Sequence, residues 1–177
     1  MRVTVYVGQS ADGFIARPDG TLDFLDRMDP VDHDMGFGEF MHSVDALVMG
    51  RNSFDFVMNS GHPWPYGDTP VIVVTSRPCE IPAALRATVE TTSLDPAALR
   101  DHLADRGRSH LYVDGAMTAR TWLHADLVTD LVLTSVPVLV GEGLRVFGPL
   151  EREPSLRHVD TTVFENGCVQ THWAIVS

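Results

Sequence analysis

Residues 46–53 have the sequence Ala46-Leu47-Val48-Met49-Gly50-Arg51-Asn52-Ser53. Its four leading apolar residues favour a short strand buried on both faces, and a glycine with a cationic neighbour follows at once. Apolar residues then recur at helical spacing at Phe54, Val57 and Met58, so a helix is expected to begin directly after the strand. This succession of strand, glycine and helix predicts an α/β fold.

Similar short, valine-rich runs occur at four other places in the chain: Val3–Val7, Val71–Val74, Leu111–Val113 and Leu131–Val140. Helix-length segments lie between them, and their apolar stripes are Phe37, Phe40, Met41 and Val44, and Ala119, Trp122 and Leu123. Strands that alternate with helices predict a mostly parallel sheet with helices on both faces.

Two further elements have clear boundary signals. Asp95-Pro96 is typical of a helix start, and Gly107 of the end of that helix. Asn166-Gly167 favours a tight turn between strands at Arg157–Phe164 and Cys168–Val176. We therefore expect one domain over residues 1–177. It should be a three-layer α/β/α sandwich with a mostly parallel central sheet and a C-terminal antiparallel hairpin.

The composition excludes several kinds of function. The 177 residues include 13 basic and 24 acidic ones, for a net charge of −11, and every basic residue is an arginine. Without lysine, the chain cannot perform lysine Schiff-base chemistry or use a Walker-type phosphate lysine. The acidic balance and the scattered arginines argue against nucleic acid as a partner.

Other compositional features point to a cytoplasmic protein without a metal. No apolar run approaches the roughly 20 residues that span a bilayer, and the N-terminus becomes polar too early for a signal peptide. Cys79 and Cys168 are far apart, which favours free thiols in a reducing compartment over a disulfide. The eight histidines lack the spacing of a metal site.

Three strand ends carry residues suited to an anion, because ligands of parallel sheets bind beyond the carboxyl ends of the strands. They are Gly50-Arg51-Asn52-Ser53, Thr75-Ser76-Arg77, and Asp114-Gly115-Ala116-Met117-Thr118. Free N–H groups at a helix start favour phosphate, and a guanidinium adds a full charge. The alternative is that these are structural glycines and solvated arginines.

Two other residues are candidates for the substrate side of a site. Asp34 lies three residues before Phe37, on the face of the apolar stripe, so it is expected to point inward or along a cleft rim and to supply a proton. Alternatively, it complements the helix dipole. Trp64 stands in a loop, where it can stack on a planar substrate or cover the core.

In this order, the segments resemble the dihydrofolate-reductase-like proteins, especially the C-terminal reductase of bacterial riboflavin biosynthesis. The resemblance rests on Ser10–Ala16, Met49–Ser53, Thr75–Arg77, Asp114–Ala116 and Pro137–Phe147. It implies an NADPH-dependent reductase acting on a small planar substrate of the pterin, pyrimidine or carbonyl type. It also implies a relation to 5-amino-6-(5-phosphoribosylamino)uracil reductase and self-association as a homodimer.

The resemblance also assigns roles to residues. It implies these cofactor contacts: Ala11, Ile15, Gly50, Arg51, Asn52, Ser53, Thr75, Ser76, Arg77, Asp114, Gly115, Ala116, Met117 and Thr118. It places Gln9, Asp12 and Trp64 against the substrate. Asp34 lies sixteen positions before Gly50, as does the substrate-binding acid of dihydrofolate reductases, which supports Asp34 as the catalytic residue.

Two departures from the family pattern leave alternatives open. The family has Gly-Gly where this chain has Gly115-Ala116, and an added Cβ there could hinder the cofactor. The riboflavin reductases carry a lysine in the first strand, where this chain has Tyr6. The alternatives to an NADPH reductase are a non-catalytic nucleotide- or ligand-binding protein of the same fold and a flavin- or deazaflavin-dependent reductase.

Overall fold

The computed structural model describes residues 1–28 and 34–176, and its central feature is an eight-stranded sheet in the order β5-β4-β3-β6-β1-β7-β10-β9. The strands are β1 (Arg2–Ser10), β3 (Ala46–Gly50), β4 (Val71–Val74), β5 (Val89–Thr92), β6 (His110–Asp114), β7 (Asp130–Val136), β9 (Ser155–Val163) and β10 (Val169–Val176). Neighbours from β5 to β7 are parallel, whereas β10 is antiparallel to both β7 and β9. A separate antiparallel pair joins β2 (Phe14–Ala16) to β8 (Leu144–Arg145).

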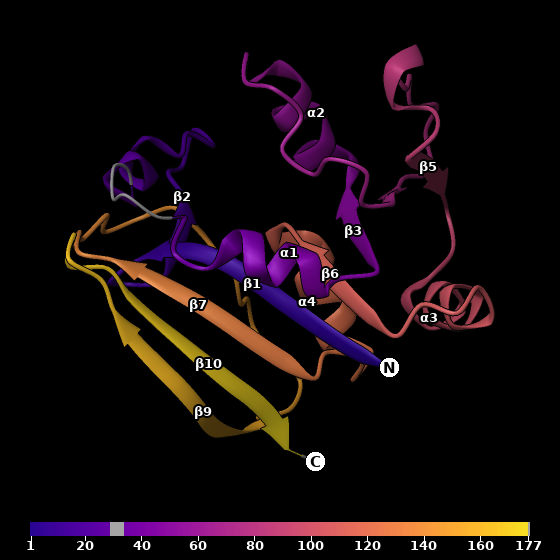
Figure 1. The fold of residues 1–177 in the computed structure, drawn as a ribbon. Coiled ribbons are helices and arrows are strands. Elements are labelled where there is room, and N and C mark those ends of the chain that lie inside the picture. Colours follow the sequence, from indigo (N-terminus) through magenta and orange to yellow (C-terminus); the bar gives the residue numbers. More distant parts are fainter. Residues whose placement is uncertain (29–33, 177) are drawn as a thin grey trace.

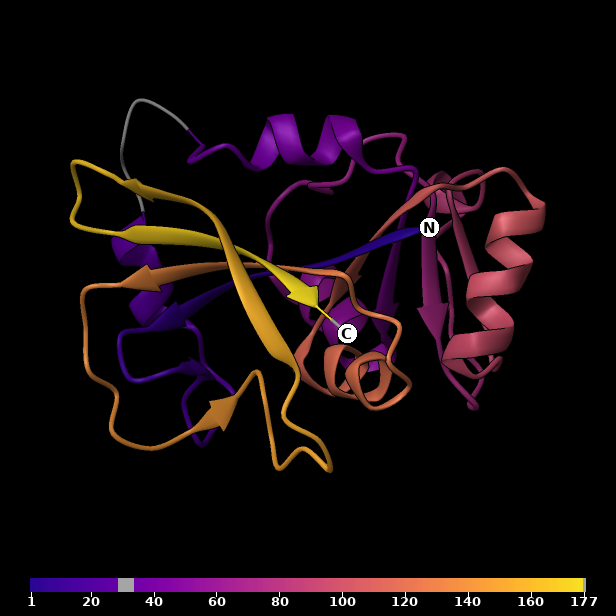
Figure 2. The ribbon, with the colours of Figure 1, turned by 90° about the horizontal axis from the view of Figure 1, so that it is seen from below.

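Helices cover both faces of this sheet. α1 (Phe37–Ser43) and α2 (Arg51–Asn59) pack on one face, and α3 (Pro96–Asp105) and α4 (Ala116–His124) pack on the other. Figure 1 shows the arrangement from the side of α1, and Figure 2 shows the sheet between α1 and α4. Two short 3-10 helices complete the elements, η1 (Asp23–Met28) and η2 (Ala83–Leu85). The expected three-layer sandwich is confirmed.

The apolar strand runs are continuous because both faces of the sheet are covered. In β3, Leu47 and Met49 belong to the cluster under α1 and α2, whereas Ala46 and Val48 belong to the cluster under α3 and α4. All four are fully buried. Alternation along the strand therefore sends successive side chains into two separate cores.

The boundary signals in the sequence also hold. The Asp95 side chain accepts a hydrogen bond from the backbone N–H of Ala98 at 2.9 Å, which caps α3. Gly107, with φ of +76°, follows the end of that helix. Gly167 has φ of +81° in the turn between β9 and β10. Within residues 1–28 and 34–176, none of the helices has the length and apolar character required to cross a bilayer.

Two expectations about elements are wrong, and one strand has no counterpart in the sequence prediction. The strand predicted over Leu131–Val140 ends at Val136, because Pro137 has no N–H to continue the ladder. Met58 does not complete a buried stripe in α2, since its exposed fraction is 37%. No strand was predicted at Val89–Thr92, whose sequence Val-Glu-Thr-Thr buries one side chain only, because β5 is the edge of the sheet.

Candidate functional site

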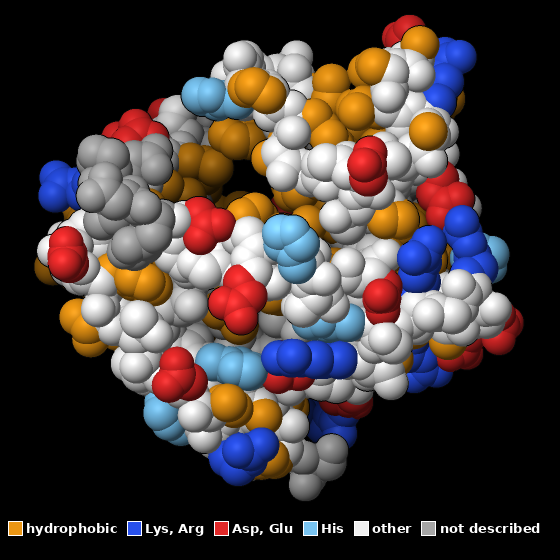
Figure 3. Space-filling model, in the orientation of Figure 1, with side chains coloured by type: hydrophobic (Ala, Val, Ile, Leu, Met, Phe, Trp, Pro, Cys, Tyr) orange, Lys and Arg blue, Asp and Glu red, His pale blue; other side chains and the backbone are white. Residues whose placement is uncertain are grey.

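The parallel strands end at different levels along one edge of the sheet. β3 and β6 end together, since Met49 pairs with Asp114. β1 pairs with β6 as far as Val113 and then continues beside β7 to Ser10. β1 and β7 therefore extend beyond the carboxyl ends of β3 and β6 and border one side of the space there. Figure 3 shows a hollow with hydrophobic walls on this side, which comparison with Figure 1 places between β2 and α2.

The helix starts after β3 and β6 lie against each other. Gly115, with φ of +84°, precedes α4, and a Cβ at this position would lie 2.4 Å from Ser53 Oγ in the first turn of α2. A Cβ on Gly50 would lie 3.0 Å from Thr118 Oγ1 in the first turn of α4. Each glycine thus makes room for a hydroxyl of the other helix. The structure brings these four predicted residues together where α2 and α4 begin.

Both helix starts are suited to an anion. The residues at the N-cap positions are Gly50 and Gly115, which have no side chain to accept from the first-turn N–H groups, in contrast to the aspartate that caps α3. The N–H groups of residues 51–53 and 116–118 therefore depend on other acceptors. The positive end of the helix dipole adds to their attraction for a negatively charged group.

Ala116 fits this arrangement despite the family's preference for glycine. Among the described non-glycine residues, only Met35 and Asp126 have positive φ, so the alanine backbone is unstrained. Its exposed fraction is 5%, because its methyl group packs inward, whereas the next side chain, Met117, is 66% exposed. The alanine therefore leaves the N–H groups of the helix start accessible.

A second part of the site is a cationic pocket of about 370 Å³ beyond β4 and β5. Its lining consists of Arg51, Val74, Thr75, Ser76, Arg77 and Ser93. The Thr75 hydroxyl accepts from the backbone N–H of Arg77 and donates to the Arg77 carbonyl, both at 3.1 Å. Thr75 thus holds the turn that presents Ser76 and Arg77, which are both exposed.

The two arginines of the pocket are not equivalent. Arg51 donates through Nε to both carboxylate oxygens of Asp55, at 2.9 and 2.8 Å, and through one terminal nitrogen to the Pro78 carbonyl at 2.5 Å. The hydrogen bond to Asp55 raises the pKa of Arg51. The ion pairs formed by the described residues do not include Arg77. The charge of Arg77 is therefore available to bind an anion. Arg51, which is held by Asp55 and Pro78, forms part of the pocket wall.

Asp114 ends β6 and lies directly before Gly115, the residue that precedes α4. The Tyr112 hydroxyl donates to Asp114 Oδ1 at 3.0 Å. Burial raises the pKa of Asp114, although the hydrogen bonds from Tyr112 and from the Gly115 backbone N–H oppose this change. Burial also raises the pKa of Tyr112. The end of β6 therefore combines a buried carboxyl group whose pKa is raised with a buried phenol.

Asp12 holds two loops together at the end of β1. Its Oδ1 accepts from the Ser10 hydroxyl at 2.6 Å and from the Val140 N–H at 3.1 Å, and its Oδ2 accepts from the Gly141 N–H at 2.7 Å. The Ser10 hydrogen bond is the main reason that the pKa of Asp12 is lowered to about 2. Both oxygens are used within the protein, so a substrate contact through this carboxylate stays a prediction.

The other predicted contact residues near the strand ends each have separate surroundings. The backbone N–H of Ala11 donates to the Val138 carbonyl at 2.9 Å. Ile15 packs against the core under α3 and α4. Gln9 is half-buried in β1, opposite Ser135 of β7. Asn52, in the first turn of α2, is exposed.

Asp34 lies before α1 rather than on its apolar face, and its side chain is exposed. An inward orientation of the carboxylate is therefore wrong, and the alternative orientation along a cleft rim stays a prediction. Oδ1 accepts from the Gly36 N–H at 3.0 Å and Oδ2 from the Gly38 N–H at 2.6 Å, as a helix cap does. A Cβ on Gly38 would lie 2.5 Å from Oδ2, so this cap requires the glycine. A catalytic role for Asp34 stays a prediction.

The Trp64 ring packs against other aromatic side chains, and its indole Nε1 has no hydrogen-bond partner among the described residues. Its ring meets Phe54 and Tyr66 edge to face, at centroid distances of 6.1 and 5.0 Å. Its Nε1 is buried, and no hydrogen-bond acceptor for it lies among the described residues. The expected cover over the core is observed, and the unpaired N–H is a donor that a bound molecule could use.

Sequence reasoning missed three residues of this region. Ser93 lines the cationic pocket, but it follows the polar edge strand that apolar patterning could not find. Tyr112 has the pattern of an ordinary strand residue, and only the fold brings its hydroxyl to Asp114. Arg145 donates to the Asp12 carbonyl at 3.0 Å, and its guanidinium lies 4.2 Å from the Phe14 ring centroid. No local signal marks that contact, because 133 residues separate Arg145 from Asp12.

Comparison with known proteins agrees with the fold. The family model for the RibD C-terminal domain matches residues 1–170. A solved structure described as a putative riboflavin biosynthesis protein from Shewanella sp. PV-4 is 33% identical, with full coverage of both chains and a TM-score of 0.93.

Two more distant structures share the fold. The first is a diaminohydroxyphosphoribosylaminopyrimidine deaminase/5-amino-6-(5-phosphoribosylamino)uracil reductase from Thermotoga maritima, which is 16% identical with a TM-score of 0.72; the alignment covers 99% of this chain and 56% of that one. The second is the dihydrofolate reductase of Enterococcus faecalis, at 17% identity and a TM-score of 0.65, with coverage of 99% and 97%. Together with the domain match over nearly the whole sequence, these likenesses show that the chain belongs to the RibD C-terminal domain family, whose fold is of the reductase type.

Proposed function

We propose that this protein is an NADPH-dependent reductase that transfers a hydride to a small planar substrate of the pterin, pyrimidine or carbonyl type. Its chemistry would be related to that of 5-amino-6-(5-phosphoribosylamino)uracil reductase. The observation that carries the proposal is the pair of interlocked, glycine-capped helix starts beside a pocket with Arg77 available for a phosphate. The likeness to a dihydrofolate reductase complexed with NADP(H) supports the choice of cofactor.

The residues present fit a dinucleotide with an additional phosphate. The first-turn N–H groups of α2 and α4 would hold the pyrophosphate, where a side chain on Gly115 would fill the space. Ser76 and Arg77 would hold the extra phosphate, because a guanidinium and a hydroxyl are both donors for such a group. When bound, NADPH supplies the hydride, and the protein supplies orientation and electrostatics.

The remaining residues of the hollow would orient the substrate. Trp64 lies beside the α2 side of the site with a free indole N–H, which is suited to a planar heterocycle bearing acceptors. The loop held by Asp12 would border the nicotinamide at Ala11 and Ile15. A proton would reach the substrate through Asp34 or a water molecule. Tyr6 stacks on Phe40 at 4.5 Å between centroids, so an aromatic core contact replaces the lysine of the riboflavin reductases.

Titration with NADPH, followed by energy transfer from tryptophan to the nicotinamide, tests the cofactor. We expect saturable binding, with NADH weaker by about ten- to hundredfold, since one charge-assisted hydrogen bond contributes roughly 1.5–3 kcal/mol. Arg77→Ala should weaken NADPH binding to the level of NADH and leave NADH binding unchanged.

The matched control is Arg86→Ala, which removes an exposed arginine that does not line the pocket. It should bind both nucleotides as the unaltered protein does. Absence of saturable binding at millimolar NADPH would contradict the proposal. Equal affinity for NADH and NADPH would contradict the role of Arg77 alone.

Asp34→Asn removes the acid and keeps the size of the side chain. Its single amide oxygen can accept from only one of the two backbone N–H groups, those of Gly36 and Gly38, that Oδ1 and Oδ2 of Asp34 hold. We expect kcat to fall about a hundredfold or more, as is typical for loss of a general acid, and thermal stability to fall slightly because one hydrogen bond at the start of α1 is lost. NADPH oxidation with a panel of pterins, aminouracils and carbonyl compounds provides the assay.

Glu39→Gln is the control for charge, because Glu39 is an exposed acid in the first turn of the same helix. Its kcat should be unaltered. Unchanged turnover in Asp34→Asn would remove Asp34 from the mechanism. Nucleotide binding without turnover of any compound in the panel would favour the non-catalytic binding protein, and turnover with a reduced flavin or deazaflavin alone would favour the third hypothesis.

A further inference from the structure

The residues that lead into α1 include a strained one. Among the described non-glycine residues, Met35 is one of two with a positive φ, at +52°, and Gly36 follows it at +82°. Met35 is nevertheless buried, with an exposed fraction of 6%. A side chain remains in this region of the backbone only where its surroundings hold it, and such positions concentrate at functional sites. Directly before Met35 lies Asp34, through which a proton would reach the substrate.

Tyr6 holds the backbone of Met35 with its hydroxyl. Its Oη donates to the Met35 carbonyl at 3.4 Å and accepts from Nε2 of Gln170 at 2.8 Å. Because an amide nitrogen can only donate, the phenolic hydrogen is left for the carbonyl. Gln170 Nε2 also lies 3.0 Å from Thr134 Oγ1 and 3.4 Å from the Met35 carbonyl. The carbonyl that follows Asp34 is therefore held from two strands, β1 and β10.

The ring of Tyr6 fixes the start of α1 as well. It meets Phe37, the first residue of α1, edge to face at a centroid distance of 5.5 Å, and it stacks on Phe40 at 4.5 Å. Burial raises the pKa of Tyr6, the hydrogen bond from Gln170 opposes this rise, and the charge of Asp34 adds to it. The phenol therefore keeps its proton, which is the form that donates to a carbonyl.

The turn between β9 and β10 holds the side chain of Met35. Asn166 Nδ2 lies 3.1 Å from the Met28 carbonyl and 3.8 Å from the sulfur of Met35, and Asn166 Oδ1 accepts from the Cys168 N–H at 3.1 Å. Met35 also packs with Val136 and Cys168. Figures 1 and 2 show this turn on the side of the molecule where α1 begins. The C-terminal hairpin thus keeps the strained residue in place.

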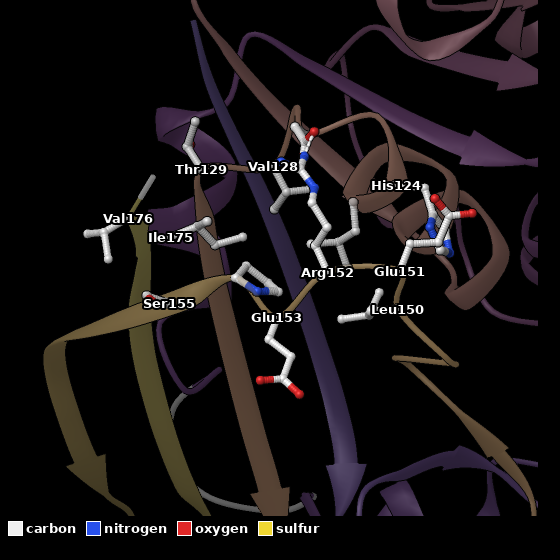
Figure 4. Close-up of a pocket in the computed structure, with 13 residues that line it drawn as sticks. His124, Val128, Thr129, Leu150, Glu151, Arg152, Glu153, Ser155, Ile175 and Val176 are labelled. Atoms are coloured by element: carbon white, nitrogen blue, oxygen red, sulfur yellow. Dashed lines mark ion pairs between the residues drawn. The ribbon is translucent and has the colours of Figure 1, made fainter.

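The opposite end of the hairpin has different surroundings. Ser155, Ile175 and Val176 line a pocket of about 470 Å³ at the amino end of β7, and Figure 4 shows them with Arg152. Arg152 forms an ion pair with Asp126 there. The lining of this pocket includes none of the residues named above as contacts of Met35. Only the half of the hairpin next to its turn therefore acts on the start of α1.

The Asp34 carboxylate is the group that these contacts keep in place. Its oxygens accept from the N–H groups of Gly36 and Gly38, which ties it to the start of α1, and Tyr6 and Gln170 tie that start to the sheet. A general acid acts only within hydrogen-bond reach of the atom that takes the proton. A displacement of about 1 Å can therefore remove much of its effect.

We propose that Tyr6 and Gln170 are positioning residues that hold Asp34 where it can pass a proton to the substrate. The proposal rests on the proposed function, in which NADPH supplies the hydride. In this step an O–H bond of the Asp34 carboxyl breaks and an N–H or O–H bond of the substrate forms beside the carbon that takes the hydride. The carboxylate then regains a proton from water. Tyr6 thus has a task of its own at the position where the riboflavin reductases carry a lysine.

Two substitutions test the proposal in the full chain. Tyr6→Phe removes the hydroxyl and keeps the ring under α1, and Gln170→Leu removes the donor with a similar volume. Each should lower kcat about three- to tenfold, as loss of one hydrogen bond does, and leave the dissociation constant of NADPH unchanged. In the Asp34→Asn background neither should lower kcat further, because residues that act through the same group do not have additive effects.

Hydrogen exchange measured by NMR gives a second result that needs neither cofactor nor substrate. The amide protons of Gly36 and Gly38 bind the Asp34 carboxylate, so they should exchange about three- to tenfold faster in Tyr6→Phe and in Gln170→Leu. Thr162→Val is the matched control, since Thr162 is exposed and lies opposite Gln170 on β9. It should change neither kcat nor the exchange of the two glycines.

Unchanged exchange at both glycines in both variants would overturn the proposal. Additive losses of kcat in the Asp34→Asn background would also overturn it, because they indicate a general effect on the fold. Full turnover by Asp34→Asn alone would overturn the link to proton supply. Absence of NADPH binding would instead contradict the proposed function, and the exchange data would still decide whether Tyr6 and Gln170 hold Asp34.

Discussion

Gly115→Ala is expected to abolish NADPH binding at concentrations that saturate the unaltered protein. Gly115 has φ of +84°, a conformation that costs a residue with a Cβ about 1 kcal/mol or more. The new Cβ would also lie 2.4 Å from Ser53 Oγ, closer than two such atoms can approach. Either the Ser53 hydroxyl would have to turn away or the two helix starts would have to separate. Either change, together with the strained backbone at position 115, would disturb the N–H groups that would hold the pyrophosphate.

A second substitution separates these two causes. Ser53→Ala removes the Oγ that the new methyl group would meet, so the double variant keeps the backbone strain and loses the clash. We expect the double variant to regain part of the thermal stability and part of the NADPH affinity, as measured by fluorescence titration. Unimpaired binding in Gly115→Ala alone would show that the cofactor does not use this junction.

The parts of the fold that could be predicted from the sequence depend on local signals. The valine-rich runs, the Asp95 cap and the Asn166-Gly167 turn act over a few residues, and each forms the expected element, although the strand in the Leu131–Val140 run ends at Val136. The carboxyl ends of parallel strands necessarily share one edge of the sheet. For that reason, the segments that begin at Gly50 and Asp114 could be placed together before any contact between them was known.

The details that escaped prediction depend on contacts between distant parts of the chain. Asp12 looked like a turn residue, and its hydrogen bonds to the N–H groups of Val140 and Gly141 bridge almost 130 positions. Asp34 looked like a member of a helical stripe, but the helix begins three residues later and the carboxylate caps it. In both cases the sequence identifies a carboxylate at a candidate site. Its orientation depends on the backbone N–H groups that it binds in the fold.

Gly115-Ala116 shows how a departure from a family pattern can be resolved by backbone geometry. On the sequence alone, the Cβ of Ala116 could hinder the approach of the cofactor. The structure assigns the positive φ to Gly115 and gives the alanine an ordinary helical backbone with a buried methyl group. This difference predicts that members of the family tolerate alanine at the position of Ala116 but not at the position of Gly115. The Gly115→Ala experiment tests the second part of this prediction.

Trp122→Ala is expected to lower the free energy of unfolding by about 3–5 kcal/mol, as removal of a large buried aromatic side chain does. Trp122 is 1% exposed and packs, with Ala119, into the core under α3 and α4. Domains of this kind have total stabilities of about 5–15 kcal/mol, so the loss is a large fraction of the whole. Urea denaturation followed by far-ultraviolet circular dichroism measures it without depending on the tryptophan that is removed.

Met117→Ala is the control within the same helix, because Met117 is 66% exposed and should change the free energy of unfolding by less than about 0.5 kcal/mol. The comparison also concerns the candidate site. Trp122 and Ala119 fix α4 against the sheet, and the position of α4 determines where the N–H groups after Gly115 lie. Trp122→Ala should therefore weaken NADPH binding even under conditions in which it remains folded. Similar losses of stability in the two variants would contradict this account of how α4 is held.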